Sequence, residues 1–140
     1  MDFAVDMPVD PDVLRSRISE VRLCLSELRR LVLRPFKELS LDERYSMRYN
    51  LIVLVESLVS LCMHICIEAY DFKPGSYREA VRIVSERLCL RNNINSLIGL
   101  RNILVHRYWR VDDERVYFEV KENFKSIEEL LGKVEEVFLV

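Results

Sequence analysis

The sequence predicts an all-α fold, an antiparallel bundle of about five helices. Apolar residues recur at intervals of three and four over most of the 140 residues, and no useful length of strand-like alternation occurs. Three glycines and four prolines are too few for a fold with many tight turns. Half of the residues are hydrophobic and 31% are charged, which is a globular composition. We expect a flexible N-terminal segment over residues 1–9 and a single helical domain over residues 10–140.

The first two helices have clear start signals. Asp10-Pro11 is a typical helix opening and predicts a helix over about 11–34, which the following proline ends. Ser40 and Glu43 form a capping box that predicts a second helix over about 41–70. This second helix is apolar on most sides, so we expect it at the centre of the bundle or in an oligomer interface.

The other three helices are shorter or more amphipathic. A second capping box at 76–79 predicts a helix over about 76–88. After a break near 91–93, a fourth helix is expected to continue to about Tyr108. An aspartate at 112–113 can cap a fifth helix, whose apolar residues keep a period near 3.6 to the C-terminus.

Composition also predicts a cytoplasmic protein. The acidic N-terminus has no signal-peptide pattern, and the apolar stretch 51–67 is interrupted by polar residues and short for a membrane span, so it indicates a buried core helix. The cysteines are expected to be small core residues in a reducing cytosol, since Cys62, His64 and Cys66 cannot converge on zinc from one helix. The full set is Cys24, Cys62, Cys66 and Cys89. We expect no metal site and no cofactor.

One stretch, Arg101-Asn102-Ile103-Leu104-Val105-His106-Arg107-Tyr108, concentrates the chemistry of the chain. In the predicted fourth helix, Arg101 occupies the middle of the apolar stripe, and Tyr108 falls within about 20° of it, on the face expected to point inward. A buried arginine is costly without a partner, and Glu56 on the second helix is the natural candidate. The apolar members of the stripe are Ile94, Leu97, Ile98, Leu104 and Val105.

The polar residues of this stretch suit metal-free cleavage of RNA. His106 can act as base or acid near neutral pH, and Arg101 can bind a phosphate and stabilise growing charge. Asn102 could orient the histidine ring or donate to the same oxygen, and Tyr108 could position a leaving group or be modified itself. Residues 73–111 hold eight Lys/Arg against two acids, a balance of +6 that favours a polyanionic ligand. A structural ion pair between Arg101 and Glu56 explains the arginine equally well, which leaves a non-catalytic binding module as the alternative.

The positions of Arg101 and His106 pose a geometric difficulty. On an ideal helix they lie about 140° apart, so one straight helix cannot direct both at one atom. Either the helix ends or distorts near His106, or two copies of the chain share the site. We prefer a two-fold dimer, because it supplies a general base and a general acid from one type of histidine.

The stretch resembles the R-x-x-x-x-H-x-Y signature of HEPN domains of the HepT type, in its R-N-x-L-V-H-x-Y form. The likeness extends from about Arg17 to Phe138. It includes residues 48–65, which resemble the second helix of the family with its glutamate and its His-Ile ending, and residues 74–80, which resemble its P-x-S-Y-x-E-A segment.

The resemblance implies an all-helical protein that dimerises through the motif-bearing helices, with higher oligomers also compatible. It implies a ribonuclease toxin of a toxin–antitoxin pair, which leaves 2′,3′-cyclic phosphate ends. Arg101 and His106 would be its catalytic pair, with Asn102 and Glu56 in support. The implied partner is a minimal nucleotidyltransferase of the MntA type, which transfers AMP to Tyr108 and silences the toxin.

Overall fold

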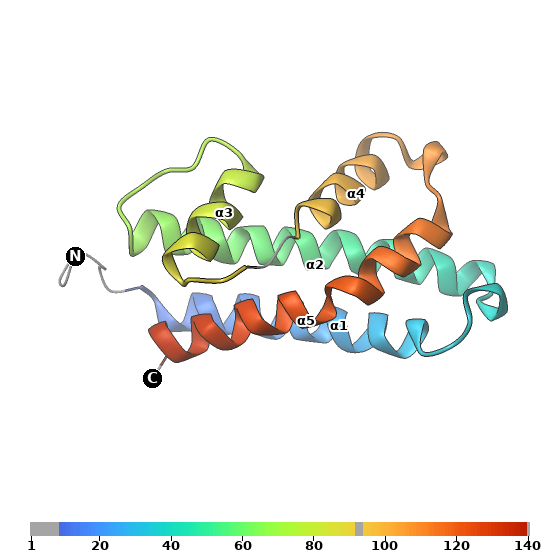
Figure 1. The fold of residues 1–140 in the computed structure, drawn as a ribbon, viewed down its shortest axis with the longest axis horizontal. Coiled ribbons are helices and arrows are strands. Elements are labelled where there is room, and N and C mark those ends of the chain that lie inside the picture. Colours follow the sequence, from blue (N-terminus) through green and yellow to red (C-terminus); the bar gives the residue numbers. More distant parts are fainter. Residues whose placement is uncertain (1–8, 92–93, 140) are drawn as a thin grey trace.

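The structure is a computed structural model that describes residues 9–91 and 94–139, and the described residues form a bundle of five α-helices with no strand (Figure 1). The predicted all-α fold is therefore confirmed. Two short 3-10 turns, η1 and η2, lie before α2 and between α4 and α5. The helices are α1 (Pro11–Val32), α2 (Leu41–Glu68), α3 (Tyr77–Arg87), α4 (Asn95–His106) and α5 (Asp113–Phe138); η1 is Phe36–Glu38 and η2 is Tyr108–Arg110.

The α2 helix is the centre of the bundle and contacts each of the other four helices. The long helices α1 and α5 lie together along one side of it, while the short helices α3 and α4 lie on the other side (Figure 1). By length and composition α2 could span a membrane, but 56% of its most apolar window is buried inside the bundle. It is thus a core helix, as its sequence predicts.

Four of the five helices begin at the caps that the sequence predicts. Asp10 accepts a hydrogen bond from the backbone N–H of Asp12, and the reciprocal capping box of Ser40 and Glu43 is complete. The side chains of Ser76 and Asp112 likewise accept hydrogen bonds from backbone N–H groups in the first turns of α3 and α5. These caps satisfy backbone N–H groups that have no partner inside the helix. In contrast, α4 has no side-chain cap at Ile94.

The cysteine prediction is correct for three residues and wrong for one. Cys24, Cys62 and Cys66 are buried, as expected of small core residues. Cys89 is exposed, because it lies beyond the end of α3 in a turn where its φ is +58°. The predicted flexible segment 1–9 falls almost wholly outside the described residues, as do positions 92–93 of the predicted break before α4.

Candidate active site

The α4 helix carries the motif and packs against α2 with one apolar face. Its buried residues are Leu97, Ile98, Leu100 and Leu104. Three of them were expected on the inward stripe, but Val105, which was also expected there, is exposed. The inward stripe therefore ends one turn earlier than the predicted helix requires, and the last residues of α4 project away from the core.

Arg101 is held by three hydrogen bonds that use both edges of its guanidinium group. Its Nε donates to Oε1 of Glu56 at 2.6 Å, and its Nη2 donates to the same oxygen. Its Nη1 donates to Oδ1 of Asn102 at 3.0 Å, and the group lies 5.4 Å from the ring centre of Tyr77. The expected pairing of Arg101 with Glu56 is thus present. Asn102 accepts a hydrogen bond from the arginine.

Burial of this ion pair is unequal. The Arg101 side chain is only 13% exposed, whereas the Glu56 side chain is 40% exposed. A guanidinium has five N–H donors, and the three bonds described here leave two of them for a ligand. Arg101 can therefore be anchored by Glu56 and still donate to one phosphate group.

His106 is the last residue of α4 and is exposed. The helix ends here because Arg107 leaves helical geometry, with φ −141° and ψ 47°, while its N–H still bonds to the carbonyl of Ile103 at 2.7 Å. The sequence left two ways to bring Arg101 and His106 together despite their separation around an ideal helix. The first, a helix that ends near His106, is observed. Within the described residues, no hydrogen bond joins Arg101 and His106, and the Arg101 bonds go to Glu56 and Asn102.

Tyr108 does not point inward, and that part of the prediction is wrong. Because α4 ends at His106, Tyr108 belongs to the separate turn η2 and is 66% exposed. Its ring packs edge-to-face on Trp109, with centroids 5.3 Å apart and an interplanar angle of 79°. The hydroxyl group of Tyr108 is consequently at the surface, where a second protein can reach it.

Two arginines near the motif have no carboxylate partner in the part of the chain that the structure describes. Arg82 pairs with Glu86, but neither Arg107 nor Arg110 forms an ion pair with a described carboxylate. Both arginines count toward the +6 balance of residues 73–111, but the sequence alone assigned no role to Trp109, which lies in the connector between the fourth and fifth helices. The signal was present as Arg107-Tyr108-Trp109-Arg110, an aromatic pair between two cations that starts in the last two residues of the motif.

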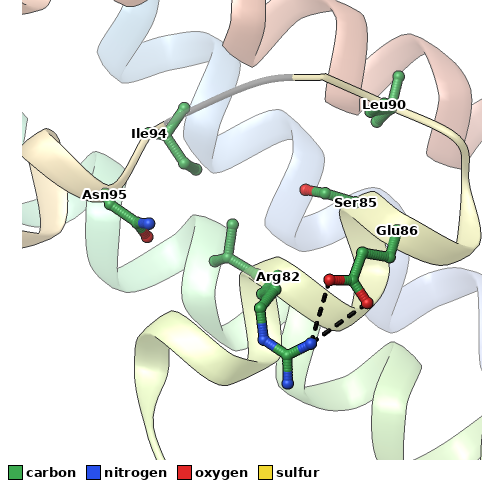
Figure 2. A pocket seen from close by; sticks show the side chains of 7 residues that line it. Arg82, Ser85, Glu86, Leu90, Ile94 and Asn95 are labelled. Carbon is green, nitrogen blue, oxygen red and sulfur yellow. Dashed lines mark hydrogen bonds and ion pairs between the residues drawn. The ribbon is translucent and has the colours of Figure 1, made fainter.

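The described residues contain no group of three or more His, Cys, Asp or Glu side chains placed to hold a metal ion. A pocket of about 200 Å³ lies between α3 and the start of α4 (Figure 2). There Arg82 donates to both carboxylate oxygens of Glu86, at 3.1 and 3.2 Å, and Asn95 lies at the rim. None of the predicted site residues lines this pocket, so it is separate from the motif.

The fold and the motif together define the class of protein. A helical bundle that carries Arg-x-x-x-x-His-x-Tyr at the end of a short helix is a HEPN domain protein of the HepT type. The ribonuclease HepT-like family model matches residues 21–134, and the chain belongs to that family. No curated protein matches the chain. Membership supports a ribonuclease-type function.

Proposed function

We propose that the protein is a metal-independent endoribonuclease and that Arg101 and His106 are its catalytic residues. The observation that carries the proposal is that the chain belongs to a ribonuclease family and contains the motif Arg-x-x-x-x-His-x-Tyr. Its Arg101 is anchored yet retains two free N–H donors, and its His106 is exposed at a helix end. This arrangement supports binding of a phosphate beside a group that can accept a proton.

The proposed chemistry needs only side chains and the RNA itself. His106 takes the proton of a ribose 2′-hydroxyl, whose oxygen attacks the adjacent phosphorus while Arg101 stabilises the charge on the phosphate oxygens. The bond from phosphorus to the 5′-oxygen breaks, and that oxygen receives a proton from a second imidazolium. The products are a 2′,3′-cyclic phosphate and a 5′-hydroxyl end. DNA lacks the attacking hydroxyl and is not cut.

The second imidazolium comes from a second copy of the chain in this proposal. Each copy has one exposed histidine in the motif, so one copy supplies a single motif imidazole. A two-fold dimer through α4 would bring two Arg/His pairs into one cleft. The partly exposed apolar side chains of α2, including Ile52, Val53 and Ile67, support an interface on the same side as Glu56.

We further propose a cytoplasmic toxin–antitoxin role with control at Tyr108. A MntA-type nucleotidyltransferase would transfer AMP to the tyrosine hydroxyl, which is exposed two residues beyond His106. A negatively charged nucleotide there would occupy the path of the substrate phosphate. Intact mass after co-expression should rise by whole AMP units in the wild type and not in Tyr108→Phe. An unmodified wild type would contradict the regulatory part alone.

The deciding experiment is cleavage of labelled single-stranded RNA and tRNA in EDTA. The wild type should cut and leave 2′,3′-cyclic ends, while His106→Ala should not. His64→Ala is the matched control, because it removes the other histidine of the chain and should retain cleavage. If AMP-free wild type does not cut, or if His106→Ala cuts as well as the wild type, the nuclease assignment is lost.

The alternative is a non-catalytic module that docks a nucleotidyltransferase. One observation favours it: the ion pair with Glu56 gives Arg101 a structural reason to be present. Under this alternative, loss of Arg101 lowers stability and changes no activity. Binding of the partner by His106→Ala, without any cleavage by the wild type, would support it.

A further inference from the structure

Two large aromatic side chains are exposed directly beyond the motif histidine. Tyr108 is 66% and Trp109 is 68% exposed, in a turn closed by a hydrogen bond from the N–H of Arg110 to the carbonyl of Arg107 at 2.8 Å. This turn follows α4 at the end of the bundle where the chain passes to α5 (Figure 1). An adjacent pair of exposed aromatic rings is unusual on a protein surface without a ligand to cover it.

The geometry of the pair leaves flat surface for another ring. In an edge-to-face contact the edge of one ring meets one face of the other, so each ring keeps at least one face outside the contact. Trp109 offers the larger face. A nucleic-acid base stacks on such a face in proteins that bind single strands, whatever the sequence of the strand.

The charges around the pair favour a polyanion over an apolar partner. Arg107 and Arg110 bracket the two aromatic residues, both are exposed, and neither has a described carboxylate partner. Of the acids that follow, Asp112 caps α5 and Asp113 holds Arg48 through two hydrogen bonds of 2.6 and 2.8 Å, while the exposed Glu114 forms no ion pair with either arginine among the described residues. Two arginines without carboxylate partners suit the phosphates on either side of a stacked base.

We propose that Trp109 is a substrate-binding residue that stacks on one base of single-stranded RNA, next to the scissile phosphate. Arg107 and Arg110 contact the flanking phosphates. The inference rests on the proposed function for the identity of the substrate. In this proposal η2 positions the RNA strand across His106, which lies three residues before Trp109 in the chain.

The test uses the fact that Trp109 is the only tryptophan in the chain. AMP-free wild type is titrated with a single-stranded 2′-O-methyl RNA, which binds like substrate but has no free hydroxyl to attack the phosphate. Saturable quenching of tryptophan fluorescence is expected, with little quenching by an abasic strand of the same length. Stacking is worth about 1–3 kcal/mol per base, so Trp109→Ala should weaken binding roughly 5- to 140-fold. Trp109→Phe, which keeps an aromatic face, should recover most of this affinity.

The outcomes separate this inference from the nuclease proposal. Quenching of tryptophan fluorescence without any RNA cleavage would support the stacking site and contradict the nuclease proposal. His106-dependent cleavage, with no quenching and with an unchanged KM in Trp109→Ala, would overturn the stacking site alone. Fluorescence that changes with protein concentration in the absence of RNA, together with a monomeric Trp109→Ala, would assign the aromatic pair to a protein interface and also overturn it. Because Trp109 is exposed, its replacement should leave the fold intact, and thermal melts of the variants check this.

Discussion

The unequal burial of the Arg101–Glu56 pair predicts that its two halves are unequally costly to remove. Removal of one partner from a fully buried pair costs about 3–5 kcal/mol, whereas exposed pairs contribute about 1 kcal/mol or less. Glu56→Ala leaves a cation that is only 13% exposed without its acceptor. We therefore expect a loss of about 2–3 kcal/mol in the free energy of unfolding.

The reverse change should be milder. Arg101→Met keeps most of the aliphatic stem and leaves Glu56, which is 40% exposed and can be hydrated. We expect a loss of about 1 kcal/mol. The Glu56→Ala/Arg101→Met double variant should be more stable than Glu56→Ala alone, because it no longer contains an unpaired cation.

Urea unfolding at one fixed protein concentration measures all three variants, since a dimer makes apparent stability depend on concentration. Glu56→Gln is the matched control, because it retains an oxygen acceptor for Arg101 and should fall between wild type and Glu56→Ala. A Glu56→Ala variant as stable as Arg101→Met, or more stable, would refute the reasoning from burial.

Two further predictions concern groups outside the motif. In the folded protein one thiol, Cys89, should react quickly with a thiol reagent at pH 8, and all four should react after unfolding. Burial raises the pKa of Cys66 to about 11, which slows its reaction. A fast-reacting thiol that remains in Cys89→Ser would contradict the assignment of the fast reaction to Cys89. Arg22 lowers the pKa of Glu135 below 4.5 by hydrogen bonding. Because the Glu135 carboxyl has a lower pKa in the folded than in the unfolded protein, its bond to Arg22 stabilises the fold above pH 4.5. This contribution is lost as the pH falls through the pKa of the folded protein. Melts from pH 6 to 3 should therefore fall less steeply in Arg22→Ala than in wild type.

The start of each capped helix could be predicted from the sequence because the signals are local. A serine or aspartate cap acts within three residues, so its effect does not depend on the rest of the fold. The contact between Glu56 and Arg101 could also be predicted, although 45 positions separate them. Each is the charged exception on an otherwise apolar helix face, and the cost of burying either one alone requires that they meet.

The orientation of Tyr108 could not be predicted, because it depends on where α4 ends. No glycine or proline follows His106 to mark the end, so helical periodicity alone places the end two residues too late. The helix ends where Arg107 leaves helical geometry, and the chain then runs through η2 to α5, whose first residue, Asp113, is held by Arg48 from α2. The earlier helix end moves Tyr108 into η2, where it is exposed; Val105 still lies within α4 and is exposed because it falls on the outer side of that helix.

The structural and catalytic interpretations of Arg101 are compatible, and a lysine at this position distinguishes them. Glu56 occupies the Nε and Nη2 edge and thereby fixes the direction of the two remaining N–H donors. Arg101→Lys keeps the charge and can pair with Glu56, but it lacks the planar fork needed to bind carboxylate and phosphate together. If Arg101 acts on the phosphate, this variant should lose about 10²–10³-fold in cleavage rate while losing less stability than Glu56→Ala. Cleavage that falls only in proportion to the unfolded fraction would show that the arginine serves the fold alone.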